Sequence, residues 1–439
     1  MSIFGTARTD AGRAARVSVG QGFTMMFGPT APVRFSAYDG SSAGRPDAPI
    51  HLRLTRPRGL AYILGAPTSL GFARAYVAGD LEIDGVHPGD PYPLLRTMSE
   101  LLEPPRLAVG DAVRALRTFA PLALSLPEPP PQEVAGPFRR AVRGMRHSRT
   151  RDAAAIHHHY DVSNRFYELV LGSSMTYTCA CFPEADSTLE QAQANKYDLV
   201  ARKLGLRPGM RLLDVGCGWG GMVRHAAREY GVTAVGVTLS GEQAAWATQA
   251  IEREGLAGRA QVRHQDYRAV SESGFDAVSS IGLSEHIGVA NYPAYFTFLR
   301  SRLRPGGRLL NHSITRPDNR HPGIRRRGFI DRYVFPDGEL TGSGAMITAM
   351  QDAGLEVQHE ENLRRHYALT LRDWGQNLVE SWDEAVVEVG AGTARVWGLY
   401  MAGSRLSFER GQIELHQVLA TRTEESGDPH YPMRPDFGT

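Results

Sequence analysis

The chain is poor in cysteine and has no long apolar run. Its cysteines, Cys179, Cys181 and Cys217, are few and odd in number, which excludes a disulfide framework and indicates a reducing compartment. No stretch approaches the roughly 18 apolar residues that a membrane-spanning helix needs. Residues 1–23 contain no unbroken apolar segment typical of a signal peptide. We therefore expect a cytoplasmic protein that associates with membranes only at their surface.

Charge is balanced over the whole chain but concentrated in one segment. Lysine and arginine number 49 against 47 acidic residues, so the net charge of +2 gives no reason to expect a nucleic-acid partner. Between Arg139 and Arg151 there are six arginines and no acid. Helical spacing would place several of them on one face, which suits an anionic membrane surface. A solvated basic face beside a linker is the alternative interpretation.

A proline-rich stretch divides the chain into two parts. Four of the eight residues 126–133 are proline, so this stretch can hold neither a helix nor an inner strand. Before it, strand-like alternation predicts a small α+β domain at 1–125, of a lipid-binding or dimerisation type. After it we expect a catalytic domain at 151–439, with 126–150 as linker and basic segment. A homodimer is the expected assembly.

The larger part alternates strands with helices. Strand patterns are expected at 211–215, 233–239, 261–264, 275–281 and 308–314. Capping boxes at 187–190 and 240–243 predict the start of two helices. This alternation predicts an α/β fold with a doubly wound, mostly parallel sheet. Residues 412–419 alternate with period two, which suggests a half-exposed antiparallel edge strand.

The first of these strands runs into a turn rich in glycine. Residues 214–221 read DVGCGWGG, and a helical pattern follows. Glycine lets a ligand lie directly against the backbone, and the N–H groups of a helix start face the same space. The spacing is neither the dinucleotide G-x-G-x-x-G nor a phosphate loop. It favours the S-adenosylmethionine cradle of a Rossmann-like methyltransferase, while an ordinary strand-to-helix turn is the plain alternative.

In a doubly wound sheet, ligands bind beyond the carboxyl ends of the strands. The residues expected there for an adenosine are Gly216, Gly218, Thr238, Gln243, Asp266 and Tyr267. The next two strand ends bring Glu285 and His312 to the same edge. Alone, Glu285 would be taken as a helix cap and His312 as a core histidine. Beside a cofactor cradle, the two together favour a functional site.

Several ordered segments resemble the cyclopropane fatty acid synthase family, which includes mycolic acid cyclopropane synthases and methylene-forming fatty acyl phospholipid methyltransferases. The resemblance spans about 155–420 and extends in outline to 75–80. The segments are 158–167 (HHYDVSNRFY), 175–180 (MTYTCA), 214–221, 236–240 (GVTLS), 265–268 (QDYR), 285–288 (EHIG), 291–292 (NY) and 333–338 (YVFPDG).

The resemblance implies transfer of one carbon from S-adenosylmethionine to a cis double bond in the unsaturated acyl chains of membrane phospholipids. It also implies a bicarbonate ion as the base. The residues that it assigns to the bicarbonate cage are Cys179, Glu285, His312 and Tyr367, with the backbone of Ile314. The residues that it assigns to the cofactor are Tyr177, Thr178, Gly216, Gly218, Thr238, Gln243, Asp266 and Tyr267.

Elementary chemistry agrees with such a site. An alkene is a weak nucleophile, so the methyl donor has to be held close and in line. Methyl transfer leaves a carbocation, which water would capture, so the site has to be dry and lined by aromatic rings. A base then removes a proton. No metal is expected, because Cys179 and Cys181 have no second pair and His157–His159 are consecutive.

The sequence leaves the product and two alternative functions open. Direct proton loss closes a cyclopropane, whereas a preceding hydride shift leaves a methylene, the precursor of a 10-methyl branch that a reductase partner would complete. Polar Asn311 and Ser284 are hypothesised to alter the fate of the cation, and the overall resemblance favours the methylene type. The alternatives are a methyltransferase for a soluble small molecule and an inactive lipid-binding homologue.

Overall fold

The computed structural model describes residues 17–66, 68–100, 109–125, 127–133, 162–320, 328–335 and 338–438. The contacts divide the chain into two compact units, 1–87 with 96–130 and 88–95 with 131–439. The basic segment 139–151 and His157–His159 lie outside the described residues. In the described ranges, no helix is both long and apolar enough to span a bilayer.

The smaller unit is built on a four-stranded sheet in the order β2-β1-β3-β4, as an α+β unit was predicted. β1 and β3 run parallel, and the two outer strands are antiparallel to their neighbours. Phe23 stacks on Phe35 with ring centroids 4.3 Å apart, inside the core that this sheet forms with α1. The elements are α1 (Val19–Phe27), β1 (Arg34–Ala37), β2 (Ser42–Gly44), β3 (His51–Leu54), α2 (Pro57–Gly65), α3 (Ser69–Val77), β4 (Leu81–Asp84), α4 (Tyr92–Ser99, which spans the division) and α5 (Val109–Ala123).

The larger unit is built on a seven-stranded sheet in the order β10-β11-β9-β8-β5-β6-β7. β11 is antiparallel to both of its neighbours, and the other pairs are parallel, which confirms the predicted doubly wound fold. The strands are β5 (Arg211–Val215), β6 (Thr233–Thr238), β7 (Ala260–His264), β8 (Phe275–Ile281), β9 (Leu303–Thr315), β10 (Glu356–Asn362) and β11 (Glu414–Thr421).

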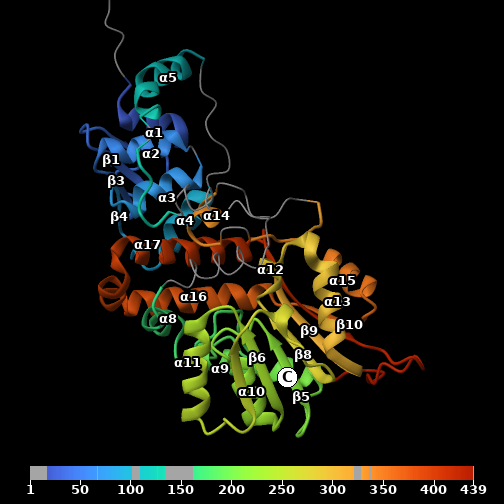
Figure 1. Cartoon of the computed structure of the whole chain (residues 1–439). Helices are drawn as coiled ribbons and strands as arrows, with labels where there is room; N and C mark the ends of the chain where they lie inside the picture. Colours follow the sequence, from blue (N-terminus) through green and yellow to red (C-terminus); the bar gives the residue numbers. More distant parts are fainter. Residues whose placement is uncertain are drawn as a thin grey trace, which may run out of the picture. The chain divides into compact units, whose positions relative to one another are not determined.

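Helices cover both faces of this sheet, as Figure 1 shows. One face packs against α9, α10 and α11, and the other packs against α13 and α15. The long helices α16 and α17 lie side by side at one end of the strands. The helices are α8 (Asn164–Leu171), α9 (Leu189–Leu204), α10 (Gly221–Tyr230), α11 (Gly241–Arg253), η1 (Tyr267–Ala269), α12 (Ser284–Ile287), η2 (Val289–Asn291), α13 (Tyr292–Arg302), α14 (Phe329–Tyr333), α15 (Ser343–Asp352), α16 (Arg364–Glu380) and α17 (Trp382–Glu409).

Strand alternation places a set of polar residues on the face that α9 covers. Leu212 of β5 and Leu310 of β9 belong to the core on that side, so the residues two positions further on, Asp214 and His312, point the same way. Asp214 is paired in register with Ser279 of β8, whose hydroxyl donates to it at 2.6 Å. The α9 face of the sheet is therefore apolar at its centre and polar toward the carboxyl ends of its strands.

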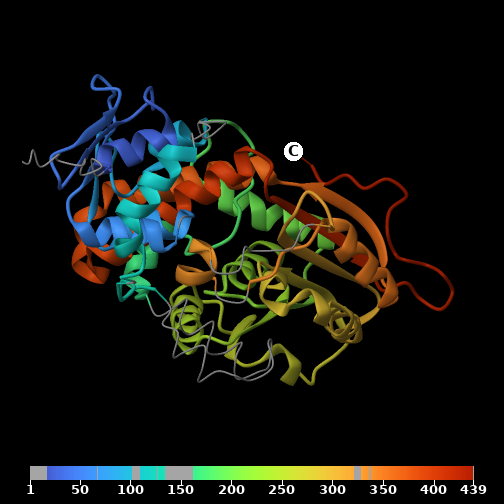
Figure 2. The ribbon, with the colours of Figure 1, turned by 90° about the horizontal axis from the view of Figure 1, so that it is seen from above.

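The expected edge strand is not at the edge. β11 is antiparallel as predicted, but it lies between β9 and β10, and seven of its eight residues are buried. The edge strand is β10, drawn in orange at the margin of the sheet in Figure 2. Its sequence EVQHEEN is mostly polar, so it has neither the continuous apolar run of a strand covered on both faces nor the alternation of a half-buried strand.

Both expected capping boxes need correction. At the start of α9 the box is formed by Thr188 and Gln191, one residue later than predicted. At the start of α11, Ser240 caps the N–H of Gln243 as predicted, but the Gln243 side chain does not return to the cap. Its carbonyl oxygen instead accepts from the Thr238 hydroxyl at 2.7 Å, which directs this side chain into the interior.

We predict that Thr188→Ala lowers the free energy of unfolding of the larger unit by about 1 kcal/mol, the usual cost of losing an N-cap. The matched control is Ser187→Ala, because Ser187 accepts a hydrogen bond from Glu184 in the preceding turn but does not cap the helix. Chemical denaturation followed by circular dichroism measures both. An equal or larger loss in Ser187→Ala would contradict the assignment of the cap.

Candidate active site

The glycine turn after β5 has the conformation that its sequence requires. Gly216, Gly218 and Gly220 have φ angles of 76°, 53° and 74°, in the left-handed region that favours glycine. The N–H of Gly216 donates to Val237 of the neighbouring strand at 2.9 Å, which fixes the start of the turn. At Gly221, a Cβ atom would lie 2.0 Å from the hydroxyl oxygen of Tyr197. The turn is thus held tightly by β6 and α9.

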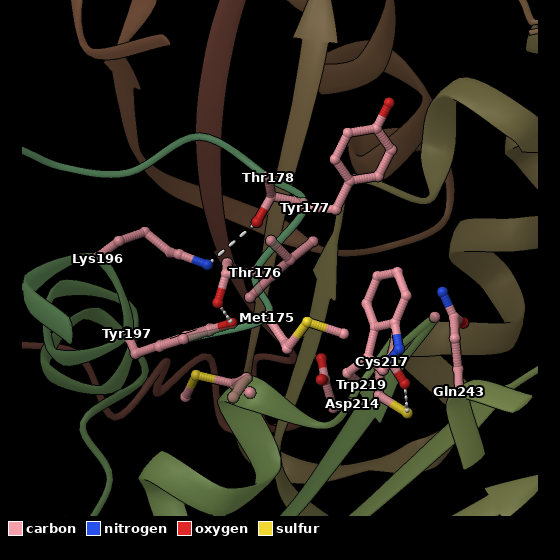
Figure 3. A pocket seen from close by; sticks show the side chains of 16 residues that line it. Met175, Thr176, Tyr177, Thr178, Lys196, Tyr197, Asp214, Cys217, Trp219 and Gln243 are labelled. Carbon is pink, nitrogen blue, oxygen red and sulfur yellow. Dashed lines mark hydrogen bonds between the residues drawn. The ribbon is translucent and has the colours of Figure 1, made fainter. Parts of the chain in front are cut away.

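This turn forms one wall of a pocket, shown in Figure 3. The opposite wall comes from the loop after α8 and from α9, which contributes Lys196 and Tyr197. Five of the residues predicted to bind the cofactor line the pocket together: Tyr177, Thr178, Gly216, Gly218 and Gln243. A pocket with a glycine turn on one side and polar side chains on the other suits a nucleoside joined to an amino acid.

The other three predicted cofactor residues lie outside the pocket lining. Thr238 is one step away, because its hydroxyl donates to Gln243. Asp266 is the N-cap of η1, and its carboxylate accepts from the guanidinium of Arg268. The Tyr267 ring packs against Tyr295 with centroids 5.3 Å apart. The carboxylate of Asp266 is therefore already engaged by a neighbour within the same turn.

The four side chains predicted for the anion cage are all buried. The thiol of Cys179 has no exposed surface, and burial raises its pKa well above the usual value, so it stays protonated. Glu285 follows β8, and its Oε1 accepts from the backbone N–H of Ile314 at 2.7 Å. Burial raises the pKa of Glu285 to about 7. Tyr367 lies on α16, with its ring packed against Phe408 at 4.6 Å between centroids.

Two buried atoms in this region lack a hydrogen-bond partner among the described residues, Oε2 of Glu285 and Nε2 of His312. Glu285 follows β8, and His312 lies near the carboxyl end of the neighbouring strand β9. Glu285 is bound to β9 itself, through the N–H of Ile314, two residues after His312. Leaving a buried polar atom unpaired costs about 1–3 kcal/mol each. Two such atoms at one strand end indicate a place for a small polar ligand.

An aromatic cluster continues from the cofactor pocket. Tyr177 and Trp219 line the pocket, and the ring of Tyr167 contacts both, with centroid distances of 5.9 and 4.8 Å. Tyr177 also lies 5.4 Å from Trp374 of α16 and 5.6 Å from Trp397 of α17. Sequence reasoning predicted aromatic walls but did not identify the rings from α16 and α17, because they lie about 200 residues from the loop that they contact.

Sequence reasoning also missed Lys196, which lines the pocket without any exposed surface. Its Nζ donates to the Thr178 hydroxyl at 3.1 Å, a hydrogen bond marked by a dashed line in Figure 3. The same Nζ lies 3.6 Å from the centre of the Tyr197 ring. Burial lowers its pKa to about 7, although Cys181, Cys179 and Asp214 act in the opposite direction. Burial likewise raises the pKa of Asp214 to about 6.

One signal could have identified this residue. The chain contains only two lysines, Lys196 and Lys203, among 49 basic residues, so 47 are arginine. Both lie on α9, seven residues apart and therefore on one helix face, and neither has exposed surface. An ammonium group is compact and has three donors, whereas a guanidinium group is planar and has five, so the two do not fit the same buried position. In an arginine-rich chain, the rare lysines mark the buried cations.

The expected effect of Asn311 and Ser284 on the cation is not supported. The Asn311 amide donates to the Ser284 hydroxyl at 3.1 Å and to the sulfur of Met346 in α15 at 2.9 Å. Because Asn311 precedes His312 in β9, its side chain points to the opposite face of the sheet. The described residues contain no group of three or more His, Cys, Asp or Glu side chains placed to hold a metal ion.

Comparison with known proteins adds the family. A model of the family described as mycolic acid cyclopropane synthetase matches residues 147–418. The chain is 61% identical over 407 residues to a probable fatty acid methyltransferase of Mycobacterium tuberculosis, which covers 92% of this chain and 94% of that protein. It is 34% identical over 269 residues to the cyclopropane-fatty-acyl-phospholipid synthase of Escherichia coli (strain K12), covering 61% of this chain and 68% of the synthase.

A solved structure agrees with these matches. The mycolic acid cyclopropane synthase CmaA1, complexed with SAH and CTAB, superposes with a TM-score of 0.58 at 33% sequence identity. The match covers 61% of this chain and 97% of CmaA1. The glycine turn and the pocket beside it are thus part of a methyltransferase fold that binds a product form of S-adenosylmethionine in a related protein.

We predict that Lys196→Met weakens S-adenosylmethionine binding about 10- to 100-fold, because a charge-assisted hydrogen bond contributes about 1.5–3 kcal/mol. A cation in the pocket wall favours the carboxylate end of the cofactor. The wild-type dissociation constant should rise as the pH increases through about 7, where Lys196 loses its proton. Isothermal titration calorimetry across this range measures both effects.

The control for this prediction is the pH profile of Lys196→Met itself. Ionisation of the cofactor's own amino group affects both proteins equally, whereas the pKa of Asp214, which the Lys196 charge lowers, should rise in the variant. Lys196→Arg keeps the charge, but we expect weak binding because the guanidinium does not fit between Thr178 and Tyr197. Unchanged affinity and pH profile in Lys196→Met would exclude this role.

Proposed function

Because this chain belongs to the mycolic acid cyclopropane synthetase family of S-adenosylmethionine-dependent methyltransferases, we propose that it transfers one carbon to the cis double bond of an unsaturated acyl chain in a membrane phospholipid. The observation that carries the proposal is the continuity of pocket and aromatic cluster: Tyr177 and Trp219 belong to both. The cofactor fits the pocket because glycine backbone and polar side chains face each other there. When bound, it supplies a methyl group on a sulfonium centre.

The aromatic cluster suits the charge that such a transfer creates. Ring faces attract a cation, each by about 0.5–2 kcal/mol when water is excluded. Trp374 and Tyr167 have no exposed surface, and Trp397 is 5% exposed, so these rings also keep water out. A carbocation formed beside them is stabilised and protected from capture by water. Tilted ring contacts that join α16, α17 and the loop after α8 hold the wall in place.

We infer that a bicarbonate ion binds where Glu285 and His312 leave polar atoms without a partner. Cys179 and Tyr367 complete the proposed cage, and the N–H of Ile314 contributes by holding the Glu285 carboxylate in position. A ligand with both an acceptor oxygen and an O–H group can satisfy a ring N–H and a carboxylate together. When bound, bicarbonate would supply the base for proton removal. Glu285 has to be ionised to accept a hydrogen bond from it.

The product is proposed to be of the methylene type. A relative that is 61% identical and shares 92% of this chain is named a probable fatty acid methyltransferase, whereas the cyclopropane synthase of E. coli is 34% identical and shares 61% of this chain. A methylene product would then require a separate reductase to give a methyl branch. Since Asn311 and Ser284 bind each other on the opposite face of β9, we do not assign the choice of product to them.

Access to the lipid is proposed to depend on the basic segment. The segment 139–151 contains six arginines and no acid, and each basic group near an anionic surface contributes about 1 kcal/mol. We expect the protein to associate peripherally with anionic membranes through these residues. A variant with the six arginines replaced by glutamine should lose binding to anionic vesicles while it keeps its affinity for the cofactor.

We predict that cells expressing this chain gain one CH2 unit on their monounsaturated phospholipid acyl chains. The host should make oleate but no cyclopropane lipids, and mass spectrometry of extracted lipids measures the gain. Ozonolysis of the product separates the two outcomes, because a methylene group is cleaved and a ring is not. If the cells show no gain although the protein purified from them binds S-adenosylmethionine, the lipid proposal is rejected and a soluble substrate is favoured.

We predict that Glu285→Gln abolishes transfer without loss of cofactor binding, because a neutral amide keeps the contact to Ile314 but loses the charge. In the wild type, activity should fall as the pH decreases through about 7, where Glu285 becomes protonated. The measurement is transfer to vesicle phospholipid at saturating cofactor. Glu242→Gln, on the exposed first turn of α11, is the matched control and should retain full activity.

A further inference from the structure

A chain of buried side chains leads to His312 from the side away from its unpaired atom. Its ring Nδ1 lies 3.2 Å from the amide nitrogen of Gln417. The amide oxygen of Gln417 accepts from the ammonium of Lys203 at 2.7 Å. None of these three side chains has exposed surface. Their hydrogen bonds are therefore made inside the protein, where an incorrect orientation would leave donors facing donors.

The fold places these residues in one row. Strand register pairs His312 of β9 with Gln417 of β11, and Gln417 with Glu361 of β10. Side chains paired across neighbouring strands project on the same side of the sheet, and this side is covered by α9. Lys203, in the last turn of α9, reaches the row and also donates to Glu361. The partly exposed Glu361 balances the charge of Lys203.

The hydrogen-bond inventory of these groups allows one orientation of the Gln417 amide. An ammonium group has three donors and no acceptor, so the amide atom that faces Lys203 has to be the oxygen. The amide NH2 then faces His312. An NH2 group donates and does not accept, so Nδ1 of His312 has to be an unprotonated acceptor. The orientation follows from Lys203, which removes the usual ambiguity between amide oxygen and nitrogen.

The protonation state of His312 completes the assignment. Burial lowers its pKa well below the usual value, and the charges of Lys196 and Lys203 act in the same direction. The ring is therefore neutral and carries one proton. Since Nδ1 is unprotonated, that proton is on Nε2, the atom that has no partner among the described residues. Nε2 is accordingly a free donor.

We propose that Gln417, oriented by Lys203, fixes His312 as the neutral tautomer with its proton on Nε2, so that His312 donates to an anion and does not act as the base. The anion rests on the function proposed above, whereas the tautomer rests on the hydrogen bonds alone. Gln417 and Lys203 are thus positioning residues for the site. They act through His312 and have no contact with a reacting group in this assignment.

The test is nitrogen NMR of protein labelled with 15N in its histidine rings, with the His312 signals assigned by loss in His312→Ala. Ring nitrogens with and without a proton differ strongly in chemical shift. We expect wild-type His312 to show a protonated Nε2 and an unprotonated Nδ1 throughout the neutral pH range. A protonated Nδ1, or a doubly protonated ring, would overturn the proposal, and the protonation of the ring is read in the wild-type protein.

Gln417→Glu provides the second measurement. A carboxylate accepts and does not donate, so it should move the proton to Nδ1 or protonate both ring nitrogens. We expect kcat to fall about 100-fold, because replacing the group that hydrogen-bonds a functional histidine and fixes its tautomer has effects of this order. The affinity for S-adenosylmethionine should stay unchanged. Gln261→Glu, on the exposed side of β7, is the control of equal chemistry. An unchanged tautomer in Gln417→Glu would contradict the role of the amide.

Lys203→Met tests the orientation of the amide. Without the ammonium, Gln417 can rotate, so the ring signals should show both tautomers and kcat should fall while cofactor affinity stays constant. A ring that keeps a single protonated Nε2 in this variant would show that Lys203 does not set the orientation. If the tautomer is as proposed but lipid transfer is absent, the proposed function fails and the positioning of His312 stands.

Discussion

The site depends on the burial of two ammonium groups on one face of α9. Lys196 and Lys203 have no exposed surface, and a buried cation is stable only when hydrogen bonds and nearby charge replace water. Lys196 is satisfied by Thr178 and the Tyr197 ring, and Lys203 by Gln417 and Glu361. These partners come from a loop, two strands and α9 itself. The two cations therefore fix the loop of the cofactor pocket and the row that leads to His312.

The sequence predicted those parts of the fold that depend on local pattern. The five parallel strands from β5 to β9, the glycine turn and the antiparallel direction of β11 each follow from apolar period or backbone requirement in a short window. β10 was not predicted, because an edge strand made of polar residues has no such period. The spacing from Ser240 assigned the Gln243 side chain to a capping box. Whether this side chain bonds the helix cap or Thr238 depends on tertiary contacts that the spacing does not contain.

The same distinction applies to the site. Residues that follow a strand could be placed at one edge of the sheet from topology alone, and five of the predicted cofactor residues do line one pocket. Lys196, Trp374 and Gln417 could not be placed in this way. Each reaches the site from a helix or from a strand whose position in the sheet is set by contacts far apart in the chain. Their roles became visible only through distances and burial.

The site offers one hydrogen-bond donor and one acceptor, whereas an apolar pocket with a single base would offer only the acceptor. Nε2 of His312 is a donor by the reasoning from Lys203 and Gln417, and Oε2 of Glu285 is an acceptor when the carboxylate is ionised. In the proposed function neither group takes the proton from the acyl chain: the histidine is held as a donor, and the ionised carboxylate, positioned by the Ile314 N–H, accepts a hydrogen bond from the bound anion. In the proposed mechanism a bound bicarbonate ion would bring the base with it, and the protein would supply its position, its charge balance and the absence of water.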